Sequence, residues 1–153
     1  LLPKSFGPLG GTAFSAGYVN GRARAGTETI QNLYLGVGLP LPSDRWSLGL
    51  VYDARVLDGA GNDDSVFGAY LGHRLNEKLS LNLRGELFRD GDKLFSSESP
   101  AEQSDGHGLT ATLDYKLWEN VISRLEYRWD HTDSLVNGRH NTQALHLNLI
   151  YEF

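Results

Sequence analysis

The sequence predicts an all-β fold, an antiparallel up-and-down β-barrel of eight strands. The first observation is that apolar and polar residues alternate with a period of two in eight segments, as in half-buried strands. The second is that the connections between these segments are alternately short and long. The third is that the polar face of the strands carries as many positive as negative side chains.

Length and composition are consistent with one such domain. The chain has 153 residues, of which 40 % are hydrophobic and 22 % are charged. No run of about 18 apolar residues occurs, which excludes a transmembrane helix but leaves membrane-spanning β-strands open. The absence of cysteine excludes disulfides, thiolate metal sites and a cysteine nucleophile. A net charge of −5 without a basic run argues against a nucleic-acid partner.

Residues 1–11 are rich in Gly and Pro and do not have the pattern of a signal peptide, so we expect a leader into the first strand. The first strand, 12–20, has the weakest pattern because three aromatic or small apolar residues alternate with small ones. The second, 29–39, alternates Leu and Val with Asn, Tyr and Gly. A proline-containing connection ends it, because proline cannot donate to a β-ladder. The third, 45–57, alternates Trp, Leu and Tyr with Ser, Gly, Asp and Arg.

An acidic loop, 58–65, leads to the fourth strand, 66–75. A tight turn, 76–78, connects this strand to the fifth, 79–88, in which leucines alternate with polar residues. The longest irregular stretch, 89–108, then precedes the remaining strands.

The last three predicted strands are 109–117, 121–130 and 141–153. A turn at 118–120 joins the first two of these, and a polar loop, 131–140, precedes the third. The third places Leu145, Leu147, Leu149, Tyr151 and Phe153 on one face. For a barrel to close, this strand must pair with residues 12–20.

The connections after the second, fourth and sixth strands are about three to five residues long, and the others are about eight to twenty. Short turns on one rim and long polar loops on the other are typical of outer-membrane barrels. An even number of strands also places both termini on the short-turn rim.

The polar face is predicted to be the lumen, because enclosed charges require balance whereas a solvated surface does not. It carries six positive and six negative side chains. The turns place Asp114 opposite Arg124 and Tyr70 opposite Arg84. The predicted lumen ion-pair network consists of Asp53, Arg55, Arg74, Arg84, Glu86, Asp114, Lys116, Arg124, Glu126 and Arg128.

The apolar face is then predicted to contact lipid, which makes the fold a transmembrane barrel. Aromatic side chains near strand ends are typical of the membrane interface. The predicted interfacial aromatics are Trp46, Tyr115, Trp118, Tyr127, Trp129, Tyr151 and Phe153. A soluble lipocalin-like calyx is the alternative that has the same alternation of faces.

Three segments carry a resemblance to a known family: Leu-Ser-Leu-Asn-Leu-Arg-Gly-Glu-Leu-Phe at 79–88, Ser-Arg-Leu-Glu-Tyr-Arg-Trp-Asp-His at 123–131, and the ending Tyr-Glu-Phe at 151–153. They resemble the last strands of the OmpL-like porin family of outer-membrane barrels. The resemblance implies a Gram-negative outer-membrane location and a transport role, with lipid and lipopolysaccharide around the barrel. It also implies that the insertion machinery recognises Phe153. Porins of this kind normally have more than eight strands.

Several functions remain open from the residues alone. An eight-stranded lumen is just wide enough for side chains, so it is either a rigid plug of ion pairs or a narrow polar passage. The long loops are a candidate contact surface for another envelope protein. An alternative is a lipid A deacylase-like enzyme, with His131 and Ser134 as the candidate catalytic residues. We expect no cofactor and no metal, since Asp58, Asp63 and Asp64 match no calcium loop.

Overall fold

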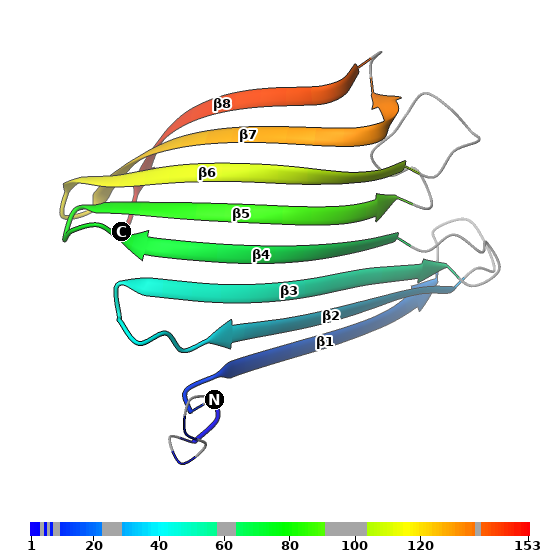
Figure 1. Ribbon diagram of the computed structural model, residues 1–153, viewed down its shortest axis with the longest axis horizontal. Helices are drawn as coiled ribbons and strands as arrows, with labels where there is room; N and C mark the ends of the chain where they lie inside the picture. Colours follow the sequence, from blue (N-terminus) through cyan, green and yellow to red (C-terminus); the bar gives the residue numbers. More distant parts are fainter. Residues whose placement is uncertain are drawn as a thin grey trace.

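A computed structural model shows an all-β protein in which eight antiparallel strands form one sheet (Figure 1). The structure describes residues 1–3, 5, 7, 10–22, 29–57, 64–90, 104–136 and 139–153. The strands are β1 (Ala13–Arg22), β2 (Thr29–Leu39), β3 (Trp46–Leu57), β4 (Asp64–Arg74), β5 (Leu79–Asp90), β6 (Ser104–Trp118), β7 (Val121–Val136) and β8 (Arg139–Tyr151).

Each strand pairs with its neighbours in the sequence, so the sheet is an up-and-down meander in the order β1 to β8. Both termini lie at the end of the sheet that carries the β2–β3, β4–β5 and β6–β7 connections (Figure 1). We call this end the turn end and the opposite end the loop end. Among the described residues, no helix is long and apolar enough to cross a membrane.

The pairing register agrees with the prediction at both of the positions where it was specified. Asp114 pairs with Arg124 across the β6–β7 turn, and Tyr70 pairs with Arg84 across the β4–β5 turn. The second turn is fixed by Asn76, whose side-chain oxygen accepts hydrogen bonds from the backbone N–H groups of Lys78 and Leu79, both at 2.9 Å. Such a local side-chain bond holds a short turn and thereby sets the register of the strands it joins.

The strands extend further towards the loop end than the sequence predicts. β6 begins at Ser104, within the predicted irregular stretch, and β7 and β8 occupy most of the predicted loop 131–140. Asp64 begins β4 and is not part of a loop. The contrast between long and short connections is therefore smaller than predicted. The β6 extension, 104–108, has no apolar alternation, and its backbone pairing with β5 holds it in the sheet.

The predicted closure between the first and last strands does not occur: β1 and β8 are the two edges of an open sheet. All ten residues of β1 are exposed. β1 contains Gly17 and Gly21 and the small residues Ala13, Ser15 and Ala16, which provide little side-chain packing to specify a partner. In water the free backbone groups of both edges are hydrated, so an open edge carries no large penalty there.

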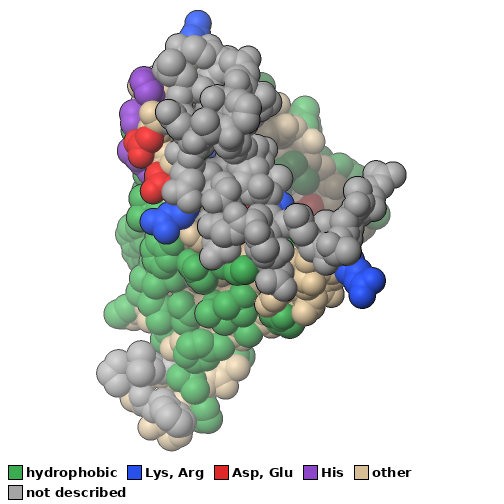
Figure 2. Space-filling model, turned by 90° about the vertical axis from the view of Figure 1, so that its right-hand side faces the viewer, with side chains coloured by type: hydrophobic (Ala, Val, Ile, Leu, Met, Phe, Trp, Pro, Cys, Tyr) green, Lys and Arg blue, Asp and Glu red, His purple; other side chains and the backbone are tan. Residues whose placement is uncertain are grey.

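On β6 the exposure of the two faces is the reverse of that expected for a central strand of a water-soluble protein. On β6, a central strand, Leu109 and Leu113 are 57 % and 37 % exposed, whereas the intervening Thr110 and Thr112 are 6 % and 9 % exposed. We call the side with Leu109 the apolar face and the side with Thr110 the polar face. Seen from the loop end, hydrophobic side chains cover the left and lower parts of the molecule (Figure 2).

Candidate functional site: the polar face of the sheet

A bidentate ion pair on the polar face joins β6 to β7. Nε of Arg124 lies 2.7 Å from Oδ1 of Asp114, and a terminal guanidinium nitrogen lies 3.0 Å from Oδ2. This bidentate arrangement is the favourable geometry for an arginine–carboxylate pair. The side-chain amide of Asn82 on β5 also donates to Asp114, at 3.4 Å. Three neighbouring strands are thus linked through one carboxylate.

A second charged cluster lies nearer the loop end on β5 and β7. Nε of Arg84 is 3.4 Å from Oε2 of Glu86, and a terminal nitrogen of Arg128 is 3.9 Å from the same oxygen. Nε of Arg128 donates to Oδ2 of Asp130 at 2.7 Å. Two guanidinium groups therefore face two carboxylates, and the charges of the cluster cancel.

Arg55 and Asp64, a directly opposed pair on β3 and β4, form a third ion pair at the loop end, with Nε 2.7 Å from Oδ2. Arg74 lies at the turn end, where it pairs with Asp44 at 3.1 Å on an exposed surface. It therefore lies apart from the other charged groups of the polar face.

The remaining members of the predicted network are less connected. Glu126 accepts a hydrogen bond from the hydroxyl of Thr112 at 3.0 Å. Asp53 and Lys116 form no ion pair with the described residues. The predicted set is thus divided into separate local groups, and no continuous chain of ion pairs joins all of its members.

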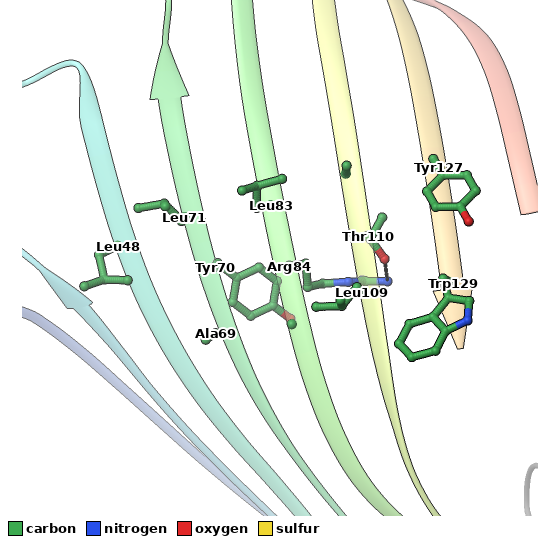
Figure 3. Close-up of a pocket in the computed structure, with 12 residues that line it drawn as sticks. Leu48, Ala69, Tyr70, Leu71, Leu83, Arg84, Leu109, Thr110, Tyr127 and Trp129 are labelled. Atoms are coloured by element: carbon green, nitrogen blue, oxygen red, sulfur yellow. Dashed lines mark hydrogen bonds between the residues drawn. The ribbon is translucent and has the colours of Figure 1, made fainter. Parts of the chain in front are cut away.

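Two buried threonines on β6 were not among the predicted site residues. Thr112 contacts Glu126, and the hydroxyl of Thr110 lies 3.4 Å from a terminal nitrogen of Arg84 (Figure 3). The signal that identifies them is the register, because Thr110 is opposite Arg84 and Thr112 is opposite Glu126. Short hydroxyl side chains on β6 leave room for the long charged side chains of β5 and β7.

The glycine-rich part of the polar face, on β2 to β4, is covered by neighbouring side chains. A Cβ added at Gly36 would be 2.8 Å from the hydroxyl of Tyr34, and one at Gly68 would be 3.1 Å from the ring of Tyr70. Each tyrosine thus lies over the glycine two positions along its own strand. The space above these two glycines is therefore occupied by side chains of the same wall.

The predicted interfacial aromatics lie at different levels of the sheet. Trp46, Tyr115 and Tyr151 are near the turn end of their strands, Trp118 is the last residue of β6, and Phe153 follows β8. Tyr127 is near the middle of β7 and Trp129 is closer to its loop end. The ring of Trp46 stacks on His73 with 3.8 Å between centroids.

The proposed catalytic pair is not established by the geometry. His131 is opposite His107 in the β6–β7 register, and their ring centroids are 5.0 Å apart. Its Nδ1 is 3.0 Å from the side-chain oxygen of Asn141. The Ser134 side chain lies outside the described residues, as do Asp58 and Asp63. Within the described part of the chain, no group of three or more metal-ligating side chains gathers.

A hollow of about 550 Å³ lies across β3 to β7 and is lined mainly by the apolar face (Figure 3). Small residues, Ala69, Gly85 and Ala111, alternate there with leucines and with Trp129. An aliphatic chain fits such a surface because it offers apolar contact area and almost no hydrogen-bonding partner.

The fold and the faces define a class of protein: an up-and-down antiparallel β-sheet with apolar side chains on one face and charged side chains, several of them in ion pairs, on the other. The chain matches the family described as Putative beta-barrel porin-2, OmpL-like, over residues 10–153. It belongs to this family of β-barrel porins. The match extends the resemblance, which the sequence indicated in three segments, to almost the whole chain. Comparisons with curated proteins and with solved structures gave no match.

Proposed function

We propose that this protein is a β-barrel of the bacterial outer membrane that encloses a narrow, charge-balanced polar lumen and admits small solutes. The observation that carries the proposal is the reversed exposure on β6, where leucines are exposed and threonines are buried. Lipid is the solvent in which this arrangement is favourable, because about 25 cal/mol is gained per Å² of apolar surface removed from water. The family match supports a porin-like role.

Closure of β1 on β8 belongs to the same proposal. In a bilayer core no water is available to hydrate the N–H and C=O groups of a strand edge, and each unsatisfied group costs several kcal/mol. The cost of leaving the edge groups of β1 and β8 unpaired, which is small in water, is large in lipid and therefore favours their pairing. The antiparallel directions of β1 and β8 are compatible with such a pairing.

The strand lengths fit a membrane crossing. A tilted transmembrane strand needs about 9–11 residues. β1 to β5 have 10 to 12 residues, whereas β6 and β7 have 15 and 16. We therefore infer that the β6–β7 pair projects beyond the membrane on the loop side, where its outward residues become His107, His131 and Asp133.

The partners follow from the faces. Outer-membrane lipid and lipopolysaccharide would surround the apolar face, and the hollow at Gly85 suits an acyl chain. Tyr151 and Phe153, which are exposed and stacked with 6.5 Å between centroids, are the proposed contact for the insertion machinery. The connections at the loop end are the proposed contact for another envelope protein.

Planar-bilayer recording of the detergent-purified protein tests the proposed function. We expect small conductance steps with nearly equal permeability to potassium and chloride, because the lumen charges are balanced. A trace that stays closed at all voltages would contradict the pore. Purified protein that remains monomeric and soluble without detergent would contradict the membrane barrel itself.

A further inference from the structure

A cavity of about 380 Å³ lies on the polar face near the loop end of β4 to β8. Its wall includes the charged cluster of Arg84, Glu86, Arg128 and Asp130, together with the aromatic ring of Phe88. The cavity thus combines both signs of charge with an apolar surface. Its volume is at the lower end of the range of about 300–1,000 Å³ that is typical of small-molecule sites.

Two glycines of β6 give room to two side chains that line the cavity. Phe88 and Asp130 belong to the strands on either side of β6, opposite Gly106 and Gly108 respectively. A Cβ added at Gly108 would lie 2.5 Å from Oδ1 of Asp130, and one at Gly106 would collide with the Phe88 ring. The absence of side chains on β6 therefore allows both groups to lean over this strand and line the cavity.

The charged groups retain unused hydrogen-bonding capacity. Oδ2 of Asp130 is bound to Arg128, but Oδ1 is buried without a hydrogen-bond partner among the described residues. Nε of Arg84 is also buried without a hydrogen-bond partner among the described residues. Its distance of 3.4 Å from Oε2 of Glu86 makes an ion pair, but the geometry is not that of a hydrogen bond. One acceptor and one donor are thus left unsatisfied, which is unfavourable for buried polar groups.

We propose that this cavity binds a small zwitterionic solute with an apolar side chain, of the amino-acid class. The carboxylate of the solute would meet Arg84 and Arg128, its ammonium group would meet Glu86 and Asp130, and its side chain would contact Phe88. A ligand of this kind offers the guanidinium groups and the carboxylates that line the cavity a partner of opposite charge, and it preserves the neutrality of the site. It thereby avoids leaving an unpaired charge on either partner.

Solutes with a single charge fit less well. An anion would be attracted by the two guanidinium groups but would lie beside the carboxylates of Glu86 and Asp130. A cation would meet the opposite difficulty. Specificity therefore arises from the repulsion of each singly charged analogue as well as from attraction of the zwitterion.

This inference deepens the proposed function. The idea that the solute is transported rests on the proposed pore, whereas binding of the solute requires only the cavity. Isothermal titration calorimetry of the complete chain, folded in detergent, tests it with three probes. These are L-leucine, N-acetyl-L-leucine with a carboxylate only, and L-leucinamide with an ammonium group only. We expect L-leucine to bind at least about tenfold more tightly than either analogue, a difference of about 1.4 kcal/mol.

Two variants should shift the relative affinities for leucinamide and N-acetylleucine in opposite directions. Arg84→Gln leaves the cavity with one excess negative charge, so leucinamide should gain relative to N-acetylleucine. Asp130→Asn leaves one excess positive charge, and N-acetylleucine should gain. The control is the double variant Asp114→Asn with Arg124→Gln, which changes the same face outside the cavity and should keep the wild-type order. Far-UV circular dichroism verifies the folding of every variant.

Equal affinities for the three probes, or no leucine binding at millimolar concentration by protein with native β-sheet content, would overturn the inference. So would a probe order that neither variant changes. Leucine binding by a protein that conducts no ions would uphold the inference and refute the pore. Conductance without leucine binding would uphold the pore and refute the inference. Failure of the inference and failure of the proposed function are therefore distinguishable.

Discussion

The pair of Asp114 and Arg124 offers a direct test of whether the polar face is enclosed. The side chain of Asp114 is 16 % exposed and that of Arg124 is 38 % exposed. Removal of one partner from a buried pair costs about 3–5 kcal/mol, whereas exposed pairs contribute about 0.2–1 kcal/mol. Because Arg124 is partly accessible, we expect a coupling energy of about 1–3 kcal/mol in a double-mutant cycle.

The cycle uses Asp114→Asn, Arg124→Gln and the double variant, with free energies of unfolding measured by urea titration in lipid vesicles. Arg124→Gln should be the more harmful single change, because it leaves a mostly buried carboxylate with only the 3.4 Å bond from Asn82. The double variant should recover much of this loss, because it leaves neither charge unpaired.

The chain contains a matched control in Arg89 and Asp105, which are also opposed across two strands. Their closest atoms are 3.6 Å apart and their side chains are 62 % and 51 % exposed. We expect a coupling below about 0.5 kcal/mol there, reduced further in 1 M salt, where the Debye length is about 3 Å. If the two cycles give equal couplings with equal salt dependence, Asp114 and Arg124 are not enclosed, and the assignment of the lumen is wrong.

Two further predictions test the apolar face and the edges. Leu147→Arg should lower the free energy of unfolding in vesicles by about 2–4 kcal/mol, because Leu147 is 74 % exposed on the apolar face of β8. The adjacent Asn148→Arg, on the polar face, should lower it much less. Equal effects of the two arginines would argue against lipid contact. Spin labels at Tyr18 and Leu147 should approach each other when the protein moves from denaturant into nanodiscs, because paired strands are about 5 Å apart. An unchanged large separation would contradict closure.

The features of the fold that are predictable from the sequence are those set by local chemistry. The apolar alternation identified all eight strands, and the short turns at Asn76 and Glu119 fixed the pairing of their flanking residues. The extensions of β6 and β7 were not predictable in this way. In 104–108 and 130–133 apolar residues no longer alternate with polar ones, so the sequence there has the composition of a loop although the backbone of β6 continues the ladder.

Tertiary context also determines the parts of the site that the sequence left undetermined. The alternation assigned Arg84 and Glu86 to one face, but it did not distinguish between ion pairing along a strand and across strands. Their proximity within β5 is a consequence of positions i and i+2 sharing a face. The roles of Gly106 and Gly108 required the registers of β5, β6 and β7 together, because each glycine accommodates a side chain from a different strand.

Local neutralisation explains how one wall of a narrow barrel can carry many charges. Arg128 and Asp130 pair along β7, and Asp114 pairs with Arg124 between β6 and β7, so both of these carboxylates have a counter-ion within the same or the adjacent strand. These pairs do not depend on contact with the opposite wall, where tyrosines cover glycines. A closed barrel could therefore enclose both walls without an ion bridge across the lumen. That separation leaves the central space free for a solute, which is the condition that a narrow passage requires.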